Sequence, residues 1–105
     1  MNPTGEFIMK LLEVSEMEVA RATVPEWRQA GGTITRTMVC KDFLAAMALV
    51  NQVARLAEAA GHHPDIDIRW NQVTLGLTTH EAGGLTEKDF ALAREIDRLG
   101  PVRQK

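Results

Sequence analysis

The sequence predicts an α+β fold: a four-stranded antiparallel sheet with three helices packed on one face, in the order α-β-β-α-β-β-α. Three helix-start signals, at Ser15, Asp42 and Thr86, divide the chain. Between them lie two pairs of strand-like runs, and a turn signal separates the members of each pair. Because hairpins pair their strands antiparallel, helices placed between hairpins cover one face of the sheet. With 105 residues, we expect a single domain over residues 1–105, with residues 1–10 disordered or loosely attached.

The first helix is expected from Glu16 to Ala22. Ser15 is followed three residues later by Glu18, which is the spacing of a capping box. In a capping box, the two side chains satisfy backbone N–H groups that the first helical turn leaves free. Pro25 ends this helix, because proline lacks the N–H that a helix interior needs.

A first hairpin comes after this helix. Gly31-Gly32 is a turn signal between a short strand near Trp27 and a second strand from Thr33 to Cys40. The second run is rich in β-branched residues, which are favoured in strands. We therefore expect these two strands to form an antiparallel pair.

The longest helix is expected from Phe43 to Ala60. Asp42 is a good N-cap residue, and Gly61 is a natural residue after the helix end because it tolerates a left-handed backbone. Apolar residues at helical spacing predict the buried stripe of this helix: Phe43, Met47, Val50, Ala54 and Ala57.

The segment from Ile66 to Thr79 predicts a second hairpin. Its large apolar residues fall on even positions before residue 71 and on odd positions after it, so one strand cannot place them all on one face. A two-residue turn at Asn71-Gln72 resolves this conflict. The predicted pairs on the buried face are Trp70 with Val73, Ile68 with Leu75, and Ile66 with Leu77.

The last helix is expected from Glu87 to Leu99. Gly83-Gly84 breaks the chain before it, Thr86 caps it, and Gly100-Pro101 closes it. Its predicted packing positions are Phe90, Ala93, Ile96 and Leu99.

Composition narrows the classes of function. The formal net charge is −2 and no run of Lys or Arg is present, which argues against nucleic-acid binding. The apolar stretch from Leu44 to Val50 is too short to span a bilayer, and residues 1–10 do not resemble a signal peptide. Cys40 is the only cysteine, so no intrachain disulfide forms. We expect a cytoplasmic protein without nucleic-acid or membrane partners, and its small core favours self-association.

The three histidines are the most informative residues. The predicted hairpin register, extrapolated outward, sets His63 against His80, so that these two and His62 gather at the open end of one hairpin. Glu58 lies one turn before His62, and Asp89 near the start of the last helix is placed to enter the same area. Clustered imidazoles with carboxylate partners are suited to proton transfer near neutral pH.

Simpler interpretations stay open on spacing alone. Histidines after a helix often lie in solvated loops, and His80 can bond a loop carbonyl. Asp89 stabilises a helix N-terminus without any catalytic duty, Glu58 is typical of a surface residue, and Trp27 is typical of a core. A zinc site is the rival chemical hypothesis. It is the weaker one, because adjacent histidines diverge and no His-x-x-x-His spacing is present.

The spacing of these groups resembles the signature of the pterin-4a-carbinolamine dehydratase family. The residues that carry the resemblance are Glu58, His62-His63-Pro64, Trp70, His80 and Asp89. Flanking stretches are also similar, namely Lys41-Asp42-Phe43, Leu77-Thr78-Thr79-His80-Glu81 and Gly84-Leu85-Thr86. The similarity runs from about Pro25 to Leu99. Trp70 stands where the family commonly has tyrosine, a change that bears on pocket shape more than on proton transfer.

The resemblance implies loss of water from 4a-hydroxytetrahydrobiopterin or a related pterin to give the quinonoid dihydropterin, without cofactor or metal. This step recycles the cofactor of aromatic amino acid hydroxylases. It also implies a homodimer or homotetramer associated through sheet edges. The implied catalytic residues are His62, His63, His80 and Asp89; the implied substrate-binding residues are Glu58, Pro64, Trp70 and Thr79. Our specific hypothesis makes His62 and His80 the proton-transfer pair. The alternative is a non-catalytic dimerisation or transcriptional cofactor module, since some family members act in that way.

Overall fold

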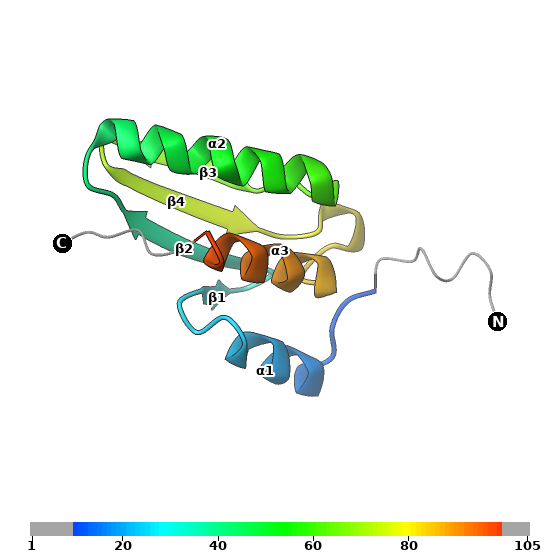
Figure 1. The fold of residues 1–105 in the computed structure, drawn as a ribbon. Coiled ribbons are helices and arrows are strands. Elements are labelled where there is room, and N and C mark those ends of the chain that lie inside the picture. Colours follow the sequence, from blue (N-terminus) through cyan, green and yellow to red (C-terminus); the bar gives the residue numbers. More distant parts are fainter. Residues whose placement is uncertain (1–9, 100–105) are drawn as a thin grey trace.

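The computed structural model describes residues 10–99 and confirms the predicted order of elements (Figure 1). The elements are α1 Val14–Ala22, β1 Arg28–Ala30, β2 Thr33–Val39, α2 Phe43–Ala60, β3 Asp65–Arg69, β4 Gln72–Leu77, the short 3-10 helix η2 His80–Ala82, and α3 Glu87–Asp97. Of the segment 1–10 that was expected to be disordered or loosely attached, residues 1–9 lie outside the described residues, as does the predicted Gly100-Pro101 helix end.

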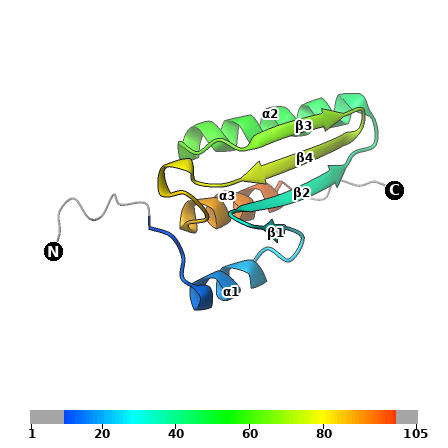
Figure 2. The same cartoon turned by 180° about the vertical axis from the view of Figure 1, so that it is seen from behind.

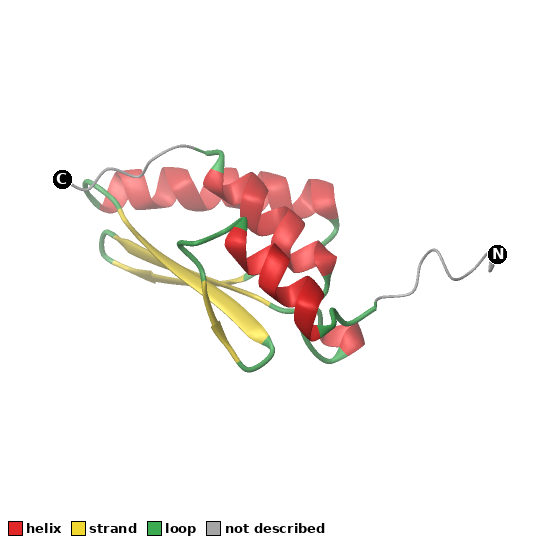
Figure 3. Ribbon diagram, turned by 90° about the horizontal axis from the view of Figure 1, so that it is seen from below, coloured by secondary structure: helices red, strands yellow, loops and turns green. Residues whose placement is uncertain are grey.

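The four strands form one antiparallel sheet in the order β1-β2-β4-β3. Strand β4 pairs with β2 along its whole length, from Leu77 opposite Ile34 to Gln72 opposite Val39, and this pairing joins the two hairpins. Figure 2 shows this sheet from behind, and Figure 3 shows the helices lying on one side of it. The predicted α+β architecture, with helices on one face, is confirmed.

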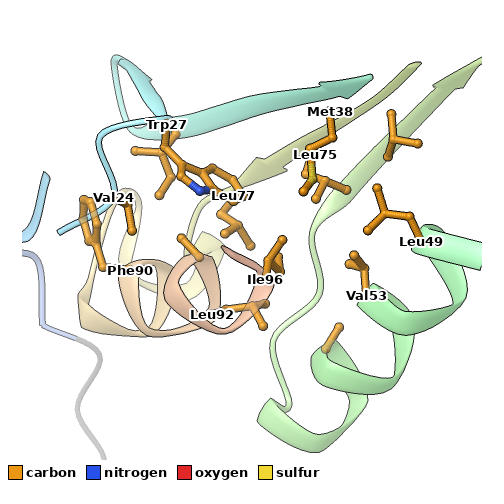
Figure 4. Packing of buried hydrophobic residues seen from close by; sticks show 14 of the residues in the cluster. Val24, Trp27, Met38, Leu49, Val53, Leu75, Leu77, Phe90, Leu92 and Ile96 are labelled. Atoms are coloured by element: carbon orange, nitrogen blue, oxygen red, sulfur yellow. The ribbon is translucent and has the colours of Figure 1, made fainter. Parts of the chain in front are cut away.

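The hydrophobic core lies between the sheet and the helices (Figure 4). Leu75 and Leu77 of β4 face it from the sheet, Phe90 and Ile96 face it from α3, and Val53 faces it from α2, all of them fully buried. Burying each such side chain contributes about 1.5–3 kcal/mol. This packing places the N-terminal turn of α3 beside the C-terminal end of α2 and the end of β4.

The bounds of α2 are as predicted, but its buried face is not. The Asp42 side chain accepts a hydrogen bond from the Ala45 N–H at 2.8 Å, and Gly61 ends the helix with a φ of +64°. The residues buried are Ala46, Leu49, Val53 and Ala57. Of the predicted stripe only Ala57 is among them, and Phe43 is 48% exposed. The prediction was wrong because α2 is apolar on several sides, and the sheet selects which side is buried.

Helix α1 begins two residues earlier than predicted. Its N-cap is Glu13, and the backbone N–H of this residue donates to the Glu16 carboxylate at 2.9 Å. The capping box therefore joins Glu13 to Glu16 rather than Ser15 to Glu18. Both pairs have the same spacing, and a glutamate is a less usual N-cap than a serine, so the sequence favoured the wrong pair.

The second hairpin forms with a different turn and register. Its turn residues are Trp70 and Asn71, and the pairs are Ile68 with Val73 and Ile66 with Leu75. Trp70 has a φ of +54° and is 69% exposed, so its predicted place opposite Val73 on the buried face was wrong. The predicted pairing of His63 with His80 was extrapolated from that register and was therefore wrong as well.

Helix α3 agrees closely with its prediction. Thr86 caps it through its side chain, and Phe90, Ala93 and Ile96 are buried as expected. Leu99 lies two residues beyond the helix end and packs, partly buried, against the core.

Within residues 10–99, α2 is the one helix whose length and mean hydropathy of 1.2 are sufficient to cross a membrane. The sequence prediction had considered only a shorter apolar stretch of this helix. Its side that carries Leu49 and Val53 packs against the sheet as a core helix does.

Candidate active site

The carboxylate of Asp89 is the centre of a buried polar cluster. Asp89 lies in the first turn of α3 and is fully buried. Its Oδ1 lies 2.6 Å from Nε2 of His62. Its Oδ2 accepts the hydroxyl of Thr79 at 2.8 Å and the backbone N–H of Thr86 at 2.9 Å. Three donors from three parts of the chain thus satisfy one buried charge, as burial requires.

The end of α2 determines where His62 lies. Gly61 adopts a left-handed backbone, and the N–H of His62 then donates to the Ala57 carbonyl at 3.1 Å. This closing contact is typical of a helix C-terminus that ends on glycine. It directs the His62 side chain inward, where only 7% of the residue is exposed.

The contact with Asp89 determines the tautomer of His62. An ionised carboxylate only accepts hydrogen bonds, so Nε2 of the neutral imidazole carries the proton. The other ring nitrogen, Nδ1, then carries a lone pair, and no group within residues 10–99 donates to it. His62 also lines a hollow of about 190 Å³ between α2 and α3. The other residues of this hollow are Ala60, Lys88, Ala91, Leu92 and Glu95.

His63 is on the surface and has a different partner. Its Nε2 lies 2.8 Å from Oε2 of Glu58, and both side chains are exposed. The sequence placed Glu58 opposite His62, whereas the structure pairs it with His63, because His62 turns inward to Asp89. Exposed pairs of this kind contribute at most about 1 kcal/mol to stability.

His80 begins η2 and is exposed. It directly follows Thr79, whose side chain contacts Asp89, just as His63 directly follows His62. Extending the observed register of β3 and β4 outward sets His62 opposite Thr79. The three histidines therefore belong to two adjacent chain segments joined through Asp89, although His63 and His80 do not line the hollow beside His62.

The remaining sequence-predicted residues fall into two groups. Pro64 lies between His63 and β3 and is half-buried, while Thr79 is fully buried with its hydroxyl already engaged. Trp70 lies at the far end of β3, six residues from Pro64, which is roughly 20 Å along an extended strand. Within one chain, the fold does not bring Trp70 to the Asp89 cluster.

Sequence reasoning missed the role of Thr86 in this cluster. It identified Thr86 only as a helix cap, whereas the backbone N–H of Thr86 also donates to Asp89. The Thr86-x-x-Asp89 capping-box spacing was the available signal. Among residues 10–99, no group of three or more His, Cys, Asp and Glu side chains is placed to hold a metal ion.

A model of one protein family matches residues 10–99, and its description is pterin 4 alpha carbinolamine dehydratase. This match covers all of the described structure. The chain belongs to this family. A relative from Chloroflexus aurantiacus, named "Putative pterin-4-alpha-carbinolamine dehydratase", is 59% identical over 88 residues. The aligned region covers 82% of this chain and 95% of the relative.

Two solved structures place this dehydratase-family fold in a wider setting. A crystal structure of a transcriptional coactivator/pterin dehydratase from Brucella melitensis matches with a TM-score of 0.81 and 34% identity, over 86% of this chain and 98% of that one. A pterin dehydratase-like protein described as a RuBisCO assembly factor in the alpha-carboxysome matches with a TM-score of 0.61 and 25% identity. That match covers 70% of this chain and 88% of the other.

Proposed function

We propose that this protein is a 4a-hydroxytetrahydrobiopterin dehydratase, a hydro-lyase that removes water from a 4a-hydroxytetrahydropterin. The observation that carries the proposal is the buried His62–Asp89 pair beside a hollow, in a chain of the pterin-4a-carbinolamine dehydratase family. A carboxylate that holds one imidazole nitrogen leaves the other ready to exchange a proton with a ligand.

The reaction needs two proton transfers. The 4a-hydroxyl receives a proton from a general acid, the C4a–O bond breaks, and water leaves. A general base takes the N5 proton, and that electron pair forms the C4a=N5 bond of the quinonoid dihydropterin. One proton is given and one is taken, so no oxidant, metal or cofactor is required. Such proton transfers contribute roughly 10²- to 10⁴-fold each.

We assign these transfers to His62 and His80. His62 is the residue whose tautomer Asp89 holds, which suits it to accept a proton at Nδ1. His80 is exposed beside the cluster, which suits it to exchange a proton with solvent. In this scheme His63 and its partner Glu58 bind the pterin at the rim, or His63 shares in proton transfer, and Pro64 supports that segment.

A stopped-flow dehydration assay on freshly generated 4a-hydroxytetrahydropterin tests the proposal. The wild-type protein should accelerate decay of this compound, and His62→Ala and His80→Ala should each slow it by roughly 10²- to 10⁴-fold. Thr37→Val is the control, because Thr37 bonds Thr74 on the exposed face of the sheet. Unchanged rates in both histidine variants would remove the assignment.

A second candidate function is a non-catalytic cofactor for another protein. This candidate is supported by the names of the two matching structures, a transcriptional coactivator/pterin dehydratase and a RuBisCO assembly factor. This function predicts no dehydration above background, together with a specific protein bound stoichiometrically during purification under native conditions. The enzymatic function predicts dehydration above background and no such stoichiometric protein partner. We also propose a cytoplasmic homodimer or homotetramer that is functionally linked, through its product, to an aromatic amino acid hydroxylase.

A further inference from the structure

We propose that Thr79 is a positioning residue: its buried hydroxyl holds the Asp89 carboxylate in the orientation that bonds His62. The consequence for catalysis rests on the proposed function, whereas the contact itself does not. Sequence resemblance had assigned Thr79 to substrate binding. Because the residue is fully buried and its hydroxyl is already bonded to Asp89, that side chain has no free face to offer a pterin.

The direction of every hydrogen bond around Thr79 is determined by the chemistry of the groups. Asp89 accepts, so the single hydroxyl proton of Thr79 points to its Oδ2. The Oγ1 atoms of Thr79 and Thr86 are 2.8 Å apart, so Thr86 must donate its own proton to Thr79. The Oγ1 of Thr86 accepts the backbone N–H of Lys88 at 3.2 Å. A chain of hydrogen bonds, all donated in the same direction, therefore runs from the Lys88 N–H through both hydroxyls to the carboxylate that contacts His62.

Thr79 is anchored independently of the carboxylate. Its N–H donates to the Gly84 carbonyl at 3.0 Å, and its own carbonyl accepts the N–H groups of Ala82 and Gly83 at 3.0 Å each. These contacts fold the segment after β4 back on itself and hold the backbone of Thr79 in place. The hydroxyl therefore approaches Asp89 from a backbone position that does not depend on the carboxylate.

The capping box formed by Thr86 and Asp89 does not account for all the hydrogen bonds of the Asp89 carboxylate. In that box the Thr86 and Asp89 side chains each accept the backbone N–H of the other residue, without help from Thr79. The last torsion of an aspartate is soft, however, so a single donor on Oδ2 leaves the carboxylate plane free to rock. A second donor from Thr79 holds that plane, and Oδ1 then stays 2.6 Å from His62.

The test compares Thr79→Val, which removes the hydroxyl at nearly constant volume, with Thr79→Ser, which keeps it. Imidazole ¹⁵N chemical shifts, measured without substrate, should report the Nε2–H tautomer of His62 in the wild type. Thr79→Val should mix the tautomers and lower kcat by up to about 100-fold with little change in KM, because misplacement of a catalytic group acts on turnover. Thr79→Ser should restore both readouts, and Thr37→Val, which loses a similar hydroxyl pair on the exposed face, should alter neither.

A folded Thr79→Val variant with the wild-type His62 tautomer and kcat would overturn the proposal. If that variant does not fold, the wild-type protein still decides, because the Thr79 hydroxyl proton should exchange slowly enough to be seen by NMR; rapid exchange would overturn the proposal. If the wild type has no dehydratase activity, the proposed function fails, while the tautomer and exchange measurements still decide whether Thr79 positions the pair.

Discussion

Nε2 of His62 and Oδ1 of Asp89 lie 2.6 Å apart, although the two residues are 27 positions apart in the sequence. Helix α2 delivers the imidazole at its C-terminal end, and helix α3 delivers the carboxylate in its first turn. The pair therefore depends on how these two helix ends meet, and it offers the most direct test of the site.

Asp89→Asn should lower kcat by about 100-fold or more and destabilise the fold by about 1–3 kcal/mol. An amide has one acceptor oxygen and an NH₂ group, so it cannot satisfy the three donors that now meet this carboxylate. Stopped-flow kinetics and urea unfolding measure the two effects. Glu26→Gln is a matched control, since it makes the same chemical change at an exposed position between α1 and β1. Equal kinetics for Asp89→Asn and wild type would contradict the prediction.

Asp97→Ala should destabilise the fold by about 1–3 kcal/mol and leave the kinetics of dehydration unchanged. Oδ1 of Asp97 accepts Nε1 of Trp27 at 2.9 Å and an Arg36 guanidinium N–H at 2.5 Å. Removing the carboxylate leaves the indole N–H without this partner in a nearly buried position. Urea unfolding monitored by circular dichroism gives the free energy. A loss of kcat without a loss of stability would be the opposite result.

Trp70→Asn should stabilise the isolated chain by up to about 1 kcal/mol. Trp70 holds a φ of +54°, a left-handed conformation that costs most side chains about 1–2 kcal/mol and that asparagine tolerates better. At 69% exposure the indole recovers little of this cost by burial. Thermal unfolding at low protein concentration measures the change. A fall in stability that grows with protein concentration would instead indicate that Trp70 is buried between copies of the chain.

Cys40 should make stability fall as pH rises through the alkaline range. Burial, and to a lesser extent the negative charge of Asp42, raises the pKa of the Cys40 thiol. The unfolded chain therefore ionises this thiol at lower pH than the folded chain, and its stabilising effect is lost as pH rises towards the raised value. Urea unfolding between about pH 7 and 10 should show a steeper decline for wild type than for Cys40→Ala. Parallel profiles would contradict this.

The sequence predicted elements better than it predicted faces and registers. The bounds of α2 were correct because Asp42 and Gly61 are local signals that act on their own backbone. Its buried face was wrong because Leu49 and Val53 compete with equally apolar residues on other sides, and only the tertiary contact with the sheet decides between them.

The second hairpin shows a different limit. A strand that slips by one residue exchanges its faces, whereas a change of register by two keeps every side chain on its original face. The predicted pair of Ile68 with Leu75 and the observed pair of Ile68 with Val73 differ in this way. The apolar pattern therefore predicted a hairpin here but could not determine which residues form its turn.

The site was predicted only in part, because its contacts also depend on how distant segments meet. Asp89 contacts His62, in the area where the sequence placed both residues. The pairing of Glu58 with His63 instead of His62 could not be predicted, since it results from the inward turn of the chain after Gly61. The resemblance indicated Thr79 for substrate binding, but its contact with Asp89 could not be predicted, because it depends on how the segment after β4 meets α3.

The last turn of α2 has a consequence for how much length variation the protein tolerates. His62 belongs to the hydrogen-bonded closure of this helix, through its N–H to the Ala57 carbonyl. Each residue added to a helix rotates the chain beyond it by about 100° and advances that chain by about 1.5 Å. One inserted alanine before Gly61 would therefore move the imidazole away from Asp89 and break the pair on which the site depends.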